Sequence, residues 1–182
     1  DAAAKAGCRR IVHTSSAACI GPARAARGET IPADEQTPVS EQEMPSHYAR
    51  SKWQAELVAR DSAAQGAPVI IVNPSAPVGP RDVKPTPTGQ VILDFLNGKM
   101  PAYLDTGLNW VHVQDVAAGH ILAAEKGRIG ERYILGSENL TLLQLVQMVA
   151  RVTGVPEPNI ILPVGLLRAL AGPVQMLHAF MN

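Results

Sequence analysis

Short apolar runs, rich in β-branched residues, alternate along the chain with stretches whose apolar residues recur every three or four positions. The runs at residues 9–16 and 68–74 predict buried strands. Residues 132–136 predict a third strand, and residues 109–113 predict a short extended segment. The periodic stretches predict helices at about residues 47–64, 89–98, 115–126 and 142–153. Strands separated by helices are typical of an α/β protein with a parallel sheet.

Both ends of the sequence have unusual patterns. Residues 1–7 predict the last turns of a helix that ends at a glycine, so we expect the sequence to be a fragment. Residues 160–180 are strongly apolar, but proline and glycine interrupt them at Pro163, Gly165 and Gly172–Pro173. We expect one or two buried helices of a cap here, and a membrane-surface or lipid-facing segment is the alternative.

Composition narrows the classes of partner. The chain carries 16 basic and 16 acidic residues, which argues against a nucleic-acid partner, because such a protein needs an excess of positive charge. Cys8 and Cys19 lack the spacing of a zinc site or a disulfide framework. We therefore expect no metal site and a cytoplasmic location.

Three polar side chains form a candidate catalytic set. Ser16 ends the first predicted strand, and Tyr48 and Lys52 lie four residues apart on the predicted helix that follows. This spacing places the phenol and the ammonium group on one helix face, one turn apart. A nearby positive charge favours a phenolate, so a tyrosine can exchange protons with a substrate oxygen that a serine hydroxyl holds.

The order of motifs resembles that of the extended short-chain dehydrogenase/reductases, also called the NAD-dependent epimerase/dehydratase family. The segments that carry the resemblance are His13–Gly21, Tyr48–Lys52, Pro74–Arg81 and Val111–Ala117. Residues 73–90 and 93–105 look closest to the hopanoid-associated sugar epimerases, which in turn are similar to dihydroflavonol reductases. The resemblance implies the C-terminal part of a Rossmann-type, doubly wound parallel sheet and the start of a small helical substrate-binding cap.

The resemblance also implies roles for particular residues. Ser16 would polarise the substrate oxygen, and Tyr48 would be the general acid/base. Tyr48 and Lys52 would also contact the cofactor NAD or NADP, with Lys52 supporting Tyr48 and holding the nicotinamide ribose. Pro74 and Ser75 would lie along the nicotinamide. Residues expected near the small-molecule substrate are Ala76 and Arg81. The implied reaction is hydride transfer at a secondary alcohol or ketone, by an oxidoreductase or an epimerase.

The sequence departs from the family pattern at the cofactor phosphates. It contains no GxGxxG or GxxGxxG turn, so residues 1–80 resemble only the second half of a nucleotide-binding domain. Residues 81–108 and 155–182 would belong to the cap, and residues 109–154 would return to the Rossmann sheet. We expect the 182-residue chain alone to be inactive. The alternative is a non-catalytic binding or scaffold protein that has lost the cofactor half.

Two further departures concern the substrate. Nucleotide-sugar epimerases usually have Asn where this chain has Ala76, and an Arg-Asp pair where it has Leu108 and Asn109. These changes remove polar groups that hold a diphosphate, so we expect a smaller or more lipophilic substrate.

Smaller expectations concern a helix and two side chains. Ala55, Ala59 and Ala63 would permit a homodimer through the Tyr–Lys helix. Asp115 would cap the helix that it begins, and His112 would be a core residue.

Overall fold

The computed structural model describes residues 2–21, 23–24, 30–158 and 160–162. The chain divides into a first unit (residues 1–80 and 110–137) and a second unit (residues 81–109 and 138–182). The first unit contains α1 (Ala2–Lys5), β1 (Ile11–Thr14), η1 (Ala17–Cys19), β2 (Ala23–Arg24), β3 (Thr30–Ile31), η2 (Glu41–Glu43), α2 (His47–Ala64), β4 (Val69–Pro74), β5 (Ala76–Val78), α4 (Val113–Lys126) and β8 (Arg132–Leu135). The second unit contains α3 (Pro87–Leu96), β6 (Ala102–Leu104), β9 (Glu138–Thr141), α5 (Leu142–Thr153) and β10 (Ile160–Leu162). The boundary between the two units at residues 109 and 110 falls within strand β7 (Gly107–His112).

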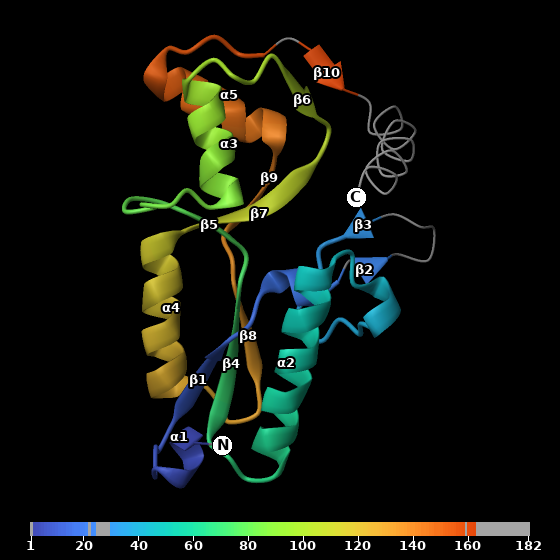
Figure 1. Ribbon diagram of the computed structural model, residues 1–182, viewed down its shortest axis with the longest axis vertical. Coiled ribbons are helices and arrows are strands. Elements are labelled where there is room, and N and C mark those ends of the chain that lie inside the picture. Colours follow the sequence, from blue (N-terminus) through green and yellow to red (C-terminus); the bar gives the residue numbers. More distant parts are fainter. Residues whose placement is uncertain (1, 22, 25–29, 159, 163–182) are drawn as a thin grey trace, which may run out of the picture. The chain divides into compact units, whose positions relative to one another are not determined.

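The core of the first unit is a parallel sheet with the strand order β1-β4-β8. The central strand β4 is buried along nearly its whole length, because helices cover both of its faces. Its first and third residues pack with Ala59 of α2, and its second and fourth residues pack with Ala123 of α4. Alternate residues of a strand point to opposite faces, so α2 and α4 cover opposite sides of the sheet (Figure 1). This α/β arrangement confirms the predicted parallel sheet.

Helix α2 begins where the sequence predicts it. The Ser46 hydroxyl oxygen accepts a hydrogen bond from the Ala49 N–H across 3.1 Å and so satisfies a free donor of the first turn. The helix packs on β4 and on the short helix η1 that follows β1. Its N-terminal half is thereby fixed beside the carboxyl end of β1.

Two alanines of α2 serve the packing of this helix on the sheet. Ala59 and the partly buried Ala63 contact the cluster formed with Val69 and Ile71 of β4, so they face the sheet of their own chain. Ala55 is exposed. Two of the three alanines suggested as a dimer contact, Ala59 and Ala63, therefore serve close helix–sheet packing, and the homodimer stays a prediction.

The second unit has its own small core. Phe95 of α3 packs against Val146 and Ala150 of α5. Helix α5 lies in this unit, whereas the sequence assigned residues 109–154 to the sheet. Residues 160–162 form β10, a strand that pairs in parallel with β6, so the predicted helix is wrong at these residues. The rest of that prediction, at residues 163–180, lies outside the described residues.

Two more local differences occur around β5 and α4. Strand β5 lies where a loop was predicted from Pro77 onward. Among the described residues β5 is at the edge of its sheet, beside β7, and an edge strand tolerates a proline. Helix α4 begins at Val113, and its N-cap is the exposed His112, whose Nδ1 accepts a hydrogen bond from the Gln114 N–H. His112 is thus a capping residue and not a core residue, and Asp115 lies in the first turn instead of at the cap.

Candidate active site

Helix α2 presents Tyr48 and Lys52 on one face, one turn apart. The Tyr48 side chain is 58% exposed, so its hydroxyl group can reach a molecule bound outside the unit. Lys52 is half-buried, and its Nζ donates a hydrogen bond to the backbone carbonyl oxygen of Thr14 across 3.3 Å. This bond joins the Tyr–Lys face of the helix to the last residue of β1.

Ser16 follows β1 and is the N-cap of η1. Its Oγ accepts a hydrogen bond from the Ala18 N–H across 3.2 Å, which leaves its own hydroxyl proton to be donated elsewhere. Helix η1 packs on α2 through a cluster of Cys19, Met44 and Ala49. Because Ala49 directly follows Tyr48, the structure brings Ser16, Tyr48 and Lys52 to the same end of the first unit.

The carboxyl end of β4 lies beside this group, since β1 and β4 are parallel neighbours with Thr14 paired to Val72. Pro74 ends β4, and Ser75 follows it with its backbone N–H and its hydroxyl both directed to the carbonyl oxygen of Leu135, at 3.1 and 3.3 Å. Ala76 is buried at the start of β5. The predicted cofactor residues Pro74 and Ser75 thus belong to the same edge of the sheet as Ser16.

Arg81, the remaining predicted substrate residue, belongs to the second unit of the chain. It is the first residue of the second unit and is exposed. Its φ of 71° is positive, which is uncommon for a residue with a side chain and marks a tight turn after Gly79–Pro80. The structure therefore gives Arg81 a turn conformation at the start of the second unit.

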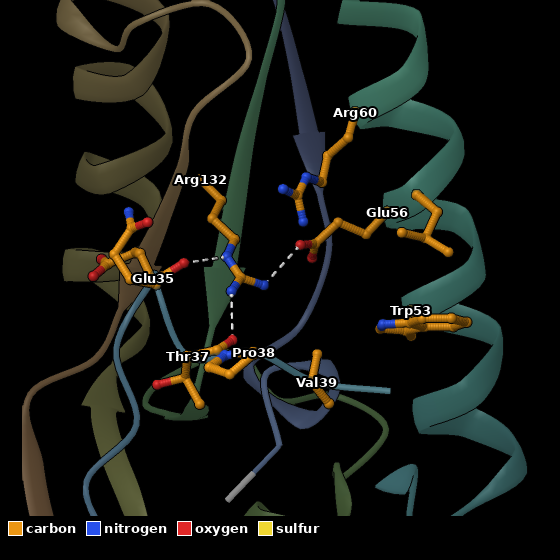
Figure 2. Close-up of a pocket in the computed structure, with 10 residues that line it drawn as sticks. Glu35, Thr37, Pro38, Val39, Trp53, Glu56, Arg60 and Arg132 are labelled. Atoms are coloured by element: carbon orange, nitrogen blue, oxygen red, sulfur yellow. Dashed lines mark hydrogen bonds and ion pairs between the residues drawn. The ribbon is translucent and has the colours of Figure 1, made fainter. Parts of the chain in front are cut away.

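A buried carboxylate lies one further turn along the same face of α2. Glu56 is 3% exposed and is the only charged side chain among the described residues that is buried. Its Oε2 accepts hydrogen bonds from Ser15 Oγ at 2.6 Å and Asn73 Nδ2 at 2.7 Å. Its Oε1 forms an ion pair with Arg132 across 3.2 Å (Figure 2).

Arg132 extends this contact to the chain segment beside β8. Its guanidinium group also donates to the carbonyl oxygens of Glu35 and Thr37, at 2.7 and 3.1 Å (Figure 2). The Glu35 carboxylate in turn accepts the backbone N–H of Ile134 in β8. The segment around residues 35–37 thereby covers the free edge of the sheet, which would otherwise expose strand donors and acceptors.

The buried groups have shifted pKa values with identifiable causes. Burial raises the pKa of Glu56, but the hydrogen bonds from Ser15, Asn73 and Cys19 and the charge of Arg132 outweigh burial, so the pKa lies below its ordinary value. Burial raises the pKa of the Cys19 thiol, which stays protonated. Burial, followed by the charge of Lys52, lowers the pKa of His13.

Sequence reasoning missed Glu56, Asn73 and Arg132. An isolated glutamate on a long helix usually faces water, and nothing in its neighbours along the chain indicates a partner. One signal was present: Glu56 repeats the spacing of four that joins Tyr48 to Lys52, so it shares their helix face. Its partners come from positions 15, 73 and 132, which only the fold brings together.

Two further properties of the described residues bear on the chemistry. No group of three or more His, Cys, Asp or Glu side chains among them is placed to hold a metal ion. Within the same part of the chain, no helix combines the length and the apolar character needed to cross a membrane.

The chain belongs to the NAD-dependent epimerase/dehydratase family, whose model matches residues 1–136. It is 47% identical over 170 residues to a Synechocystis protein named provisionally as a dihydroflavonol 4-reductase, a match that covers 90% of this chain and 48% of the relative. It is 38% identical over 171 residues to sterol demethylase protein B of Methylococcus capsulatus, covering 93% of this chain and 50% of that protein.

A solved structure of a similar protein supports the assignment of the fold. The crystal structure of a nucleoside-diphosphate-sugar epimerase from Pseudomonas aeruginosa matches with a TM-score of 0.84 and 33% identity, over 96% of this chain and 56% of that chain. The sheet is thus part of a Rossmann-type fold, as the sequence predicted. The chain spans about half the length of the relatives that it matches.

Proposed function

We propose that this chain carries the catalytic residues of an NAD- or NADP-dependent oxidoreductase or epimerase that acts on a secondary alcohol or ketone. The observation that carries the proposal is the hydrogen bond from Lys52 Nζ to the Thr14 carbonyl oxygen. It holds the helix face with Tyr48 against the strand end that leads to Ser16. The family match supports the reaction class.

The proposed chemistry is proton transfer at the substrate oxygen. When an alcohol is oxidised, its oxygen loses a proton and its carbon loses a hydride. The Tyr48 Oη takes the proton, and Lys52 lies one helix turn away on the same face. The Ser16 hydroxyl donates a hydrogen bond to the same substrate oxygen and stabilises the negative charge that develops there. In reduction the same residues act in reverse.

The residues present fit one end of a dinucleotide cofactor. Ligands of open α/β sheets bind outside the carboxyl ends of the strands, and Ser16, Pro74 and Ser75 lie at that edge beside the exposed Tyr48. Lys52 would hold the nicotinamide ribose, and Pro74 and Ser75 would lie along the nicotinamide. A bound nicotinamide ring supplies the hydride acceptor or donor at the substrate carbon. The phosphate-binding glycines would come from chain outside this sequence.

We infer a lipophilic substrate in place of a nucleotide sugar. Ala76 is buried where many nucleotide-sugar enzymes carry an asparagine, so this position offers a methyl group and no hydrogen bond. The relative named sterol demethylase protein B and the one named provisionally as a dihydroflavonol 4-reductase agree with an apolar, ring-containing alcohol or ketone. The free thiols of Cys8 and Cys19 are consistent with a reducing compartment such as the cytoplasm.

The test uses the complete protein, meaning the product of the full reading frame that contains this sequence. It is mixed with NAD or NADP and a series of secondary alcohols and ketones that ranges from sterols to nucleotide sugars. We expect a change in absorbance from the reduced nicotinamide with an apolar alcohol or ketone. Absence of dinucleotide binding and of turnover with every compound would support the non-catalytic scaffold instead.

A further inference from the structure

Glu56 is buried and has no role in the proposed proton transfer. Removing a carboxylate from water costs several kcal/mol unless its partners replace the lost hydration. Here the partners are Ser15, which directly follows β1, Asn73 in β4 and Arg132 in β8. The one carboxylate therefore links α2 to β4, to β8 and to the residue that follows β1. Such a contact can control the relative position of these elements.

Asn73 connects Glu56 to Ser16 through its side-chain amide. Its side-chain Nδ2 donates one hydrogen bond to Glu56 Oε2 and another to the backbone carbonyl oxygen of Ser16, at 2.7 and 3.2 Å. Both protons of the amide are used, and a flipped amide would point its oxygen at two acceptors. Glu56 therefore fixes the orientation in which Asn73 holds Ser16.

Ser15 provides a second connection between Glu56 and Ser16. The Ser15 hydroxyl donates to Glu56 Oε2 across 2.6 Å, and Ser15 itself is buried and directly precedes Ser16. The Ser15 backbone N–H bonds the Val72 carbonyl oxygen in β4. The peptide that leads into Ser16 is thus held at its side chain and its backbone.

We propose that Glu56 is a positioning residue, which sets the place of Ser16 relative to Tyr48 and Lys52 through Asn73 and Ser15. The inference rests on the proposed function, because it assigns a purpose to the geometry of those three residues. Since Glu56, Lys52 and Tyr48 lie on one face of one helix, the same rigid element carries both the proton-transfer groups and the group that aligns their partner.

A neutral isostere cannot replace this carboxylate. Hydroxyl and amide donors converge on Oε2, so a glutamine at position 56 must place its oxygen there. Its amide nitrogen would then face the Arg132 guanidinium group, donor against donor, at the position that is now 3.2 Å from it. One of the two sets of hydrogen bonds must therefore be lost in Glu56→Gln.

The test compares Glu56→Gln with Asp61→Asn, an equal change of charge at an exposed position of the same helix. Both are made in the complete protein, and turnover is expressed per molecule that binds the dinucleotide. We expect kcat to fall about tenfold to a hundredfold in Glu56→Gln, as misplacement of a reacting group does, with KM within about threefold. Asp61→Asn keeps the wild-type kcat.

The route through Asn73 is tested by a double-mutant cycle. Asn73→Ala is expected to lower kcat by a similar factor, and the double variant Glu56→Gln/Asn73→Ala to be no slower than the worse single variant, because both break one path. A fully additive loss, or an unchanged kcat in Glu56→Gln, overturns the proposal. If Glu56→Gln binds no dinucleotide because it fails to fold, Ser15→Ala decides: a lowered kcat supports the proposal, and an unchanged kcat overturns it.

The wild-type protein separates this proposal from the one on which it rests. Turnover by the wild type with an unaffected Glu56→Gln variant overturns only the positioning role. Absence of turnover by the wild type removes the oxidoreductase assignment and the positioning role together.

Discussion

Lys52 donates a hydrogen bond from Nζ to the backbone carbonyl oxygen of Thr14, which ties the N-terminal half of helix α2 to the end of strand β1. This hydrogen bond holds the Lys52 side chain at the carboxyl end of β1, two residues before Ser16. Under the proposed function, the Lys52 ammonium group at this position holds a cofactor ribose.

Replacement of Lys52 by methionine keeps the length of the side chain and removes its charge and its donors. We expect kcat/KM of the complete protein to fall about a hundredfold or more, since assistance to general acid–base catalysis is lost. The measurement is steady-state kinetics with the reduced nicotinamide followed by absorbance. Lys126→Met, in the last turn of α4, serves as the control. Equal kinetics for Lys52→Met and Lys126→Met would contradict the role of Lys52.

Ser16→Ala separates substrate activation from stability. The variant loses one hydrogen-bond donor to the substrate oxygen, and we expect kcat to fall about a hundredfold. It also loses the cap of η1, which costs about 1 kcal/mol in the free energy of unfolding. Kinetics and urea unfolding on the same preparation measure both effects. A variant that is destabilised but turns over at the wild-type rate would limit Ser16 to capping.

Arg132 is the counter-ion of the buried Glu56, and both side chains are nearly inaccessible, at 11% and 4% exposure. Arg132→Met leaves an unpaired buried carboxylate, so we expect a loss of about 3 kcal/mol or more in the free energy of unfolding. Adding Glu56→Gln to it should cost less than the sum of the two single variants, because the stranded charge is gone. Arg60→Met is the control, because Arg60 of α2 lines one cavity together with Glu56 and Arg132 (Figure 2). Additive losses in urea unfolding would show that the pair is not coupled.

The lowered pKa of His13 predicts how the free energy of unfolding depends on pH. Burial and the charge of Lys52 lower its pKa in the folded state from the ordinary value of 6.5. The fold therefore favours neutral His13, and its contribution to stability is complete above about pH 6.5 and is lost as the pH falls through the lowered pKa. We expect His13→Gln to reduce the decrease in the free energy of unfolding between about pH 7.5 and 5.5. An identical decrease in the variant and the wild type would rule out this group as the cause.

The sequence was most informative where one segment determines its own structure. Helix α2 has the predicted bounds because Ser46 supplies the cap locally, and β4 was recognisable from its uninterrupted apolar residues. The short strands β5 and β10 were missed. The proline in β5 and the apolar run in β10 do not identify a strand by themselves, because each strand is defined by its pairing with a partner, β7 or β6. Tyr48 and Lys52 share a helix face by spacing alone, whereas the partners of Glu56 lie up to 76 positions away and needed the fold.

Proton transfer at the substrate oxygen by Tyr48 is the step on which the proposed function depends. The most direct measurement is turnover of the complete protein carrying Tyr48→Phe, beside Tyr133→Phe, a tyrosine whose hydroxyl oxygen accepts the Arg128 N–H. We predict that Tyr48→Phe binds the dinucleotide as the wild type does and loses at least about a hundredfold in kcat, while Tyr133→Phe keeps the wild-type kcat. Wild-type turnover by Tyr48→Phe would show that Tyr48 does not transfer the proton.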